Sequence, residues 1–106
     1  MPDIVQQFEL AMVDVYNRAK FEAKYVATEF FRMIHERGGL PTAKYLINKS
    51  TPSDGYTALY ERGRLDLTVE AVVVEEERWH VLFSDDEVVR ARQRLAKYGY
   101  KPVAKS

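Results

Sequence analysis

Apolar residues recur at steps of three and four over most of this chain, which is the spacing of amphipathic helices. No glycine or proline interrupts residues 3–37, but the apolar stripe changes phase near residues 20–24. That change favours two helices over one long bent helix. Asp3 is predicted to cap the first of them, and Gly38 with Gly39 to end the second, because glycine adopts the left-handed conformation of helix ends.

The middle of the chain predicts two shorter helices separated by a loop. Pro41 suits the first turn of a helix that runs to about Asn48. The segment that follows, up to Gly55, is dense in turn-forming residues and is predicted to be a loop. Ser53 then caps a helix over residues 54–62.

Residues 67–75 are predicted to form the next helix, capped by Asp66. Their valines are β-branched and would also suit a buried strand over residues 67–74. The chain offers no second strong strand to pair with, and an isolated strand leaves its backbone hydrogen bonds unmet. The helix is therefore the favoured interpretation.

The last helix has the clearest signals. Ser84 and Glu87 have the spacing of a capping box at its start. Gly99 follows the apolar stripe at the position of a left-handed C-terminal cap, so that Tyr100 can pack back on Leu95 in a Schellman motif.

Length and composition agree with one folded domain. The chain has 106 residues, of which 46% are hydrophobic and 30% charged, and this balance is typical of a globular protein. The pattern predicts an all-α fold, a compact single-domain bundle of five or six helices over residues 1–106, with a flexible tail from about residue 101.

Two absences in the sequence bear on location. There is no cysteine, which excludes disulfides and suits a reducing compartment. The first residues lack the order of charged, apolar and small residues of a signal peptide, and the longest purely apolar run, Ala71–Val74, is far too short for a membrane span. We expect a cytoplasmic protein without membrane contact.

No catalytic constellation is evident. His35 and His80 have no partner at metal-binding spacing, and the acidic clusters at residues 75–77 and 85–87 are expected to be solvated or to stabilise helix ends. Motifs for an activated serine or for phosphate binding are absent. We therefore expect no enzyme, no metal or other cofactor and no small-molecule substrate.

An interaction surface is the better expectation. Seven tyrosines exceed the needs of a small core and suit an interface, which favours a protein partner or self-association. Nucleic-acid binding is the alternative, because residues 41–62 have a helix–turn–helix outline and the final helix has a basic face. The candidate surface residues on which these interpretations rest are Lys44, Lys49, Arg62, Arg64, Arg90, Arg94 and Lys97.

Residues 52–74 read PSDGYTALYERGRLDLTVEAVVV. This segment resembles the pattern P-S-D-G-[FY]-T-x-L-[WY]-E-x-G-R-L-D-L-T-x-E-A of a family of small bacterial helical proteins to which no activity is attached. Matches at residues 43–47 and 82–100 extend the resemblance over nearly the whole chain; Tyr60 stands where the pattern usually has tryptophan. The resemblance implies a compact helical unit that acts as an accessory partner, alone or beside nuclease and phage-defence proteins.

Overall fold

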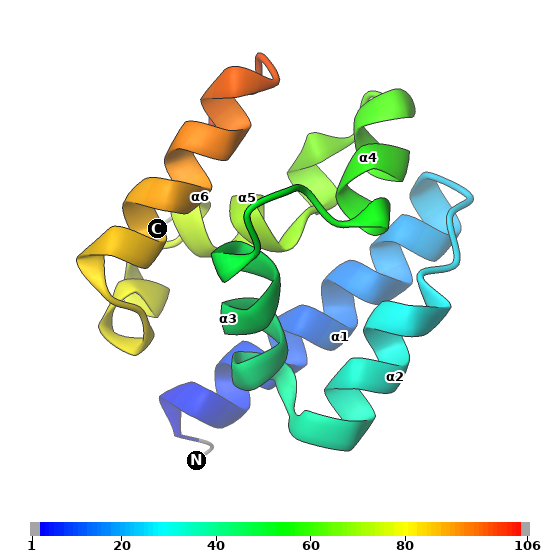
Figure 1. The fold of residues 1–106 in the computed structure, drawn as a ribbon. Helices are drawn as coiled ribbons and strands as arrows, with labels where there is room; N and C mark the ends of the chain where they lie inside the picture. Colours follow the sequence, from blue (N-terminus) through cyan, green and yellow to red (C-terminus); the bar gives the residue numbers. More distant parts are fainter. Residues whose placement is uncertain (1–2, 105–106) are drawn as a thin grey trace.

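The computed structural model describes residues 3–104. Over this range the chain forms six α-helices, two short 3-10 helices and no β-strand (Figure 1). The predicted all-α fold is confirmed, and the strand alternative for residues 67–74 is wrong. In chain order the elements are α1 (Ile4–Glu22), α2 (Thr28–Arg37), α3 (Gly39–Asn48), α4 (Asp54–Glu61), η1 (Leu65–Leu67), α5 (Val69–Glu75), η2 (Glu77–Leu82) and α6 (Asp85–Lys97).

The predicted break after the first helix is confirmed. Asp3 forms a capping box with Gln6 at the start of α1, and Lys24 turns the chain at the other end with a left-handed φ of 56°. Gly38 ends α2 with a φ of 90°. The next residue, Gly39, lies so close to α1 that a Cβ there would be 3.0 Å from the Cα of Glu9, and its N–H donates to Oε1 of Glu9 at 3.0 Å.

The start of α5 differs from the prediction. Thr68, not Asp66, caps this helix: its Oγ1 accepts from the Ala71 N–H at 3.2 Å and donates to the Leu65 carbonyl at 2.7 Å. Asp66 lies in the 3-10 turn η1 and is held by Arg64, whose Nε is 3.0 Å from Oδ1. The Asp66 carboxylate, which was predicted to cap α5, is therefore bound to Arg64 instead.

The ends of α6 agree with the prediction. Ser84 and Glu87 form the capping box. At the other end the N–H of Tyr100 donates to the Leu95 carbonyl at 2.9 Å and that of Gly99 to the Ala96 carbonyl at 3.0 Å, the hydrogen bonds of a Schellman motif. Residues 101–104 form no regular element, but the Val103 N–H donates to Oε2 of Glu75 at 3.0 Å.

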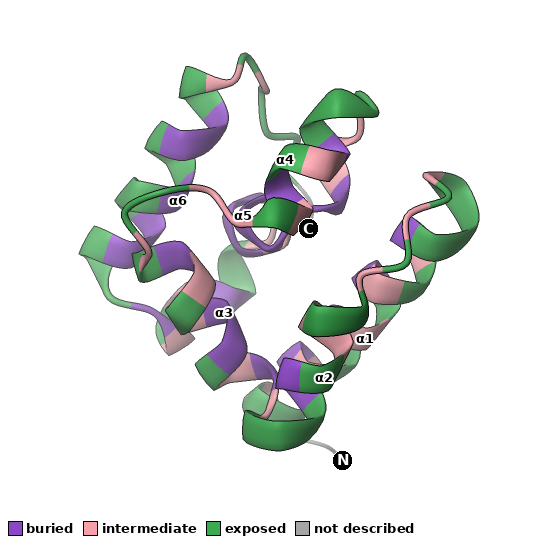
Figure 2. Ribbon diagram, turned by 45° about the vertical axis from the view of Figure 1, so that its right-hand side comes forward, coloured by how far each residue is buried: buried purple, intermediate pink, exposed green. Residues whose placement is uncertain are grey.

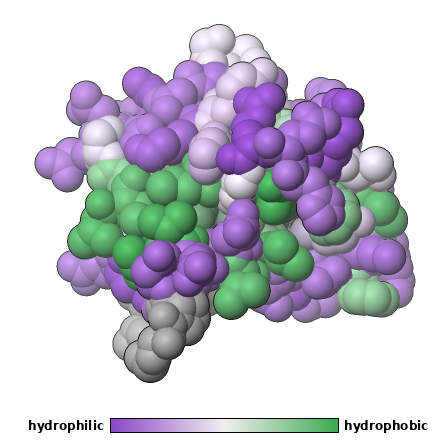
Figure 3. All heavy atoms as spheres, turned by 90° about the horizontal axis from the view of Figure 1, so that it is seen from below, coloured by the Kyte–Doolittle hydropathy of each residue, from purple (hydrophilic) through white to green (hydrophobic). Residues whose placement is uncertain are grey.

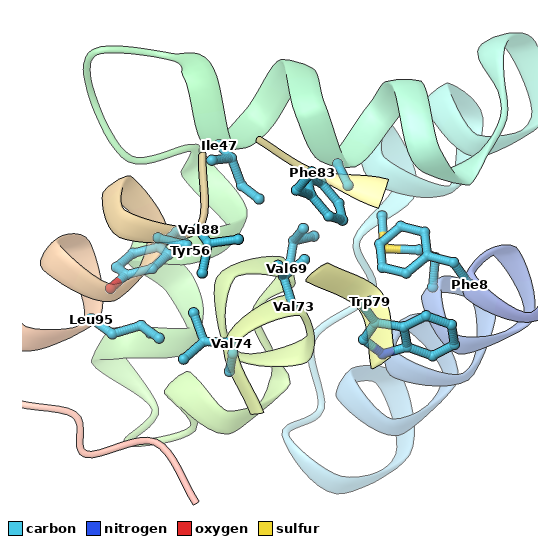
Figure 4. Close-up of a cluster of buried hydrophobic side chains, with 14 of the residues drawn as sticks. Phe8, Ile47, Tyr56, Val69, Val73, Val74, Trp79, Phe83, Val88 and Leu95 are labelled. Carbon is cyan, nitrogen blue, oxygen red and sulfur yellow. The ribbon is translucent and has the colours of Figure 1, made fainter. Parts of the chain in front are cut away.

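Helix α5 is the centre of the fold. It packs against α6, α1 and α3, and almost all of its residues are buried (Figure 2). On one side of it an aromatic cluster fills the core: the ring of Phe8 lies 5.2 Å from that of Trp79 and 5.5 Å from that of Phe83, edge to face in both pairs (Figure 4). This core fixes α1 relative to α5 and so positions one side of the site described below.

Polar and apolar side chains share the surface. On the face drawn in Figure 3 the largest group of apolar side chains lies on one side, and smaller groups are set among polar residues. Large apolar residues do reach solvent, with Val81 79%, Phe21 67% and Leu10 64% exposed. Among residues 3–104, no helix has both the length and the apolar character that crossing a lipid bilayer requires.

Candidate functional site

A cleft of about 310 Å³ opens between two walls of helices. The α1–α2 pair forms one wall; α3, the loop after it, α4 and the start of α5 form the other (Figure 2). We call it the aromatic cleft. Apolar side chains such as Val15, Leu46 and Leu59 line it, together with five aromatic side chains: Tyr16, Tyr25, Phe30, Tyr45 and Tyr56.

The aromatic residues that line the cleft differ in their exposure to solvent. Tyr45 is 48% exposed, whereas Tyr56 is only 2% exposed. The Tyr56 hydroxyl donates to the Arg94 carbonyl at 3.2 Å, and burial raises the pKa of this phenol above its ordinary value. Tyr16 stacks on Phe31 of α2 with ring centroids 4.6 Å apart. The walls are thus fixed by contacts outside the cleft, which leaves their inner surfaces free for a ligand.

Gly55 lines this cleft next to Tyr25. It is the second residue of α4, and its φ lies outside the left-handed region, so the backbone does not require glycine here. A Cβ at this position would lie 3.7 Å from the Tyr25 hydroxyl. Because Tyr25 and Gly55 both line the cleft, a longer side chain at residue 55 would narrow it. The sequence predicted that this glycine lies where the loop meets the helix over residues 54–62, but it gave no indication of the cleft.

Glu70 lines the cleft and forms a buried ion pair. Arg94 donates from Nη1 to Oε2 of Glu70 at 2.8 Å, and the two side chains are 8% and 4% exposed. Arg94 also donates to the Lys49 carbonyl at 2.6 Å and the Leu46 carbonyl at 3.2 Å. Burial raises the pKa of Glu70, against the lowering effect of the Arg94 hydrogen bond. The prediction that Arg94 lies on an exposed basic face is therefore wrong.

The other predicted basic residues do not form one surface. Lys44 pairs with Glu87 at 2.8 Å, and Arg64 pairs with Asp66 at 3.0 Å and with Glu22 at 2.7 Å. Arg90 donates to the side-chain oxygen of Asn48. Lys97 lies exposed in the last turn of α6. Several of the cations expected to contact a partner thus already have carboxylate or amide partners within the chain.

Lys49 and Arg62 both lie beside tyrosine rings that line the aromatic cleft. Lys49 lines it, and its Nζ is 5.7 Å from the centroid of the Tyr45 ring. The guanidinium of Arg62 lies 5.1 Å from the Tyr25 centroid. A third cation, Arg37, which the sequence did not single out, lies 5.2 Å from the Tyr45 centroid. Two of the four tyrosines that line the cleft, Tyr25 and Tyr45, therefore have cations on their rings.

The two hydroxyl groups of Ser53 and Thr68 that line the cleft serve as helix caps. The hydroxyl of Ser53 accepts from the Tyr56 N–H at 3.1 Å as a helix cap, and that of Thr68 caps α5. No histidine is among the lining residues; His80 contacts the Val73 carbonyl at 3.0 Å instead. In the described part of the chain there is no cluster of three or more potential metal-ligating side chains. Among the described lining residues, neither of these hydroxyl groups has a histidine beside it.

Comparisons with protein-family models, with curated proteins and with solved structures find no match for this chain. The case for a function therefore rests on the cleft itself.

Two of the buried residues had a signal in the sequence. Glu70 is the only charged residue in the apolar stretch between Thr68 and Glu75, and a lone carboxylate in such a stretch needs a buried partner. Arg94 directly precedes the buried Leu95 and follows Ala91 by three positions, which places it beside the apolar stripe.

Proposed function

We propose that this protein is a non-catalytic binding module that takes an apolar side chain of a partner protein into the aromatic cleft. The observation that carries this proposal is Gly55. Glycine in a helix costs up to about 1 kcal/mol relative to alanine, and the conformation of residue 55 does not require it. The missing side chain leaves the cleft wider beside Tyr25, which supports a use of the cleft in binding.

The dimensions of the cleft support a single anchoring side chain. Its volume of about 310 Å³ is at the lower end of the range for ligand pockets and holds one large aromatic or branched side chain with room to spare. Binding energy in protein interfaces concentrates on such buried anchors, surrounded by a rim that excludes water. Tyr45, half exposed beside Lys49, is suited to this rim.

The nucleic-acid alternative has less support. Lys44, Arg64 and Arg94 have carboxylate partners within the chain, so a phosphate would have to displace them. In addition, α3 packs on α1, α2, α5 and α6, whereas α4 packs chiefly on η1. A helix–turn–helix unit instead packs its two helices against each other.

Site-specific photo-crosslinking tests the proposal. A photoreactive phenylalanine analogue replaces Tyr45 in the cleft or, as the control, Arg92 on the exposed face of α6. We expect one protein, identified by mass spectrometry, to cross-link at residue 45 and not at residue 92. Nuclease and phage-defence proteins are the first partners to look for, given the resemblance noted in the sequence. A cytoplasmic location, which the cysteine-free sequence supports, is part of the same proposal.

The variant Gly55→Leu provides the decisive control. The leucine side chain narrows the cleft beside Tyr25, so we expect the purified partner to bind this variant at least about tenfold more weakly than the wild-type protein. Sedimentation of the wild-type protein and of the Gly55→Leu variant, each without a partner, tests whether the partner is a second copy of the chain. Cross-linking that is unchanged by Gly55→Leu would contradict the proposal.

A further inference from the structure

We infer that the partner segment is acidic: an apolar anchor side chain enters the aromatic cleft while flanking carboxylates contact Arg37, Lys49 and Arg62 at its mouth. This inference rests on the proposed function and specifies the chemistry of the partner. The evidence is the balance of charge around the cleft, taken residue by residue.

The three cations have no carboxylate partner within the chain. Over residues 3–104, none of them has an ion pair within 4.0 Å, in contrast to Lys44, Arg64 and Arg94. Each lies instead within 6 Å of the centroid of a tyrosine ring that lines the cleft. A cation on an aromatic ring keeps its full charge and remains free to accept an anion.

The acidic residues of the cleft are largely compensated. Glu70 pairs with Arg94, and Glu29 with Arg32. Asp54 remains, in the first turn of α4, where the helix N-terminus stabilises its charge. Three cations without a carboxylate partner thus contact tyrosine rings of the cleft. Asp54 is the one lining carboxylate, among the described residues, without a cationic partner. This balance favours a negatively charged ligand.

Arg62 is already held in position for such a contact. Its Nε donates to the Ala23 carbonyl at 3.2 Å and its Nη1 to the Ala58 carbonyl at 3.0 Å. These bonds tie the end of α1 to α4 across the cleft region and leave Nη2 without a partner in the described residues. A carboxylate binding there would not have to pay for ordering the arginine side chain.

Single-stranded nucleic acid also combines anionic groups with flat apolar ones, but the geometry favours a peptide. Proteins that bind single strands have a groove of cations that follows the backbone over several nucleotides. Here the unpaired cations contact only two rings of one cleft, and Lys44 and Arg64 are held in ion pairs. One anchor with adjacent charges fits this arrangement better than a continuous strand.

Peptide titrations of the full chain, followed by amide chemical shifts, test the inference. Three short capped peptides share a central tryptophan and differ only in their flanks, which are glutamate, glutamine or lysine. We expect the glutamate peptide to bind at least about tenfold more tightly than the lysine peptide and to shift the amides of the cleft. Replacing its tryptophan with alanine is expected to abolish binding, and added salt to weaken it.

Variants that remove positive charge show which residues produce the preference for glutamate flanks. Arg37→Gln combined with Lys49→Gln is expected to remove most of the preference for glutamate flanks. The matched control, Arg92→Gln combined with Lys97→Gln on α6, is expected to keep it. Arg62 is left unchanged because its hydrogen bonds also connect α1 and α4.

The outcomes separate this inference from the function on which it rests. If the lysine peptide binds as well as the glutamate peptide and Gly55→Leu abolishes both, the inference is overturned and the binding module stands. The inference is also overturned if no peptide changes the amide chemical shifts of the cleft residues. It is overturned as well if an oligothymidylate of similar length displaces the glutamate peptide and binds more tightly. The cross-linking at residue 45 decides the proposed function independently.

Discussion

Arg94 and Glu70 form an ion pair that connects α6 with α5 in the interior of the protein, with Nη1 and Oε2 2.8 Å apart. The same guanidinium donates to two carbonyl groups at the end of α3. The pair therefore holds three segments together and fixes the wall of the aromatic cleft formed by α3, α4 and α5.

Removing one partner of this pair should be costly. We expect Arg94→Met to lower the free energy of unfolding by about 3–5 kcal/mol, because it leaves a buried carboxylate without compensation. The double variant with Glu70→Leu should recover part of the loss, but not all of it, because the Leu46 and Lys49 carbonyls remain without their donor. Denaturant unfolding measures both. Arg92→Met, at an exposed position, is the control and should change stability by less than about 0.5 kcal/mol.

Two glycines should respond in opposite directions to the same substitution. Gly55→Ala is expected to stabilise the fold by up to about 1 kcal/mol, since residue 55 is helical and its new Cβ meets only ordinary contacts. Gly63→Ala should destabilise it by about 1 kcal/mol, because Gly63 has a φ of 69°. Thermal or denaturant unfolding distinguishes them. A loss of stability in Gly55→Ala would mean that glycine is required there by the fold and would remove the argument for the cleft.

The cap of α5 gives a third prediction. Thr68→Ala should cost about 1–2 kcal/mol of unfolding free energy, because it removes a buried hydroxyl that both caps the helix and binds Leu65. Asp66→Ala breaks a half-exposed ion pair and should cost at most about 1 kcal/mol. Equal losses in the two variants would show that Asp66 contributes to the helix end after all.

Glu87 should make the protein sensitive to acid. Burial raises the pKa of this carboxylate, but hydrogen bonds from Lys44, the Ser84 N–H and Asn48 outweigh it and lower the pKa from 4.5 to about 2. A lowered pKa in the folded state contributes stability that is fully present above pH 4.5 and is lost as the pH falls towards 2.

We estimate this contribution at about 1–2 kcal/mol, after allowing for solvent screening. Unfolding measured across that pH range should therefore show a smaller acid-induced loss in Glu87→Gln than in the wild-type protein. Glu77→Gln, an exposed carboxylate in η2, is the control. Parallel pH profiles for wild type and Glu87→Gln would contradict the assignment.

Helix boundaries could be predicted from the sequence where a local signal determines them. The capping box of Ser84 and Glu87 and the Schellman motif at Gly99 involve residues close in the chain, so their geometry is encoded in the spacing. The start of α5 could not be predicted this way. Asp66 and Thr68 are both good caps by residue type, and the choice between them depends on Arg64 and on Glu22, which is 42 residues away from it.

The cleft is a property of tertiary packing. Its lining comes from helices that are far apart in the sequence, and no local pattern shows that α2 and α4 leave a space between them. Of the seven predicted surface residues, only Lys49 and Arg62 contact rings that line it. The abundance of tyrosine was the useful signal, although it did not indicate which tyrosines would be brought together.

Trp79 gives this protein a built-in optical reporter. It is the only tryptophan of the chain, it is 0% exposed, and it lies among Phe8 and Phe83 rather than in the cleft. Its Nε1 has no hydrogen-bond partner among the described residues, and the guanidinium of Arg78 lies 4.1 Å from the centroid of its ring. Its emission should therefore change when unfolding exposes the indole to water and removes this contact. Emission from Trp79 therefore follows unfolding of the core. The tyrosines that line the cleft respond instead to a ligand that enters it.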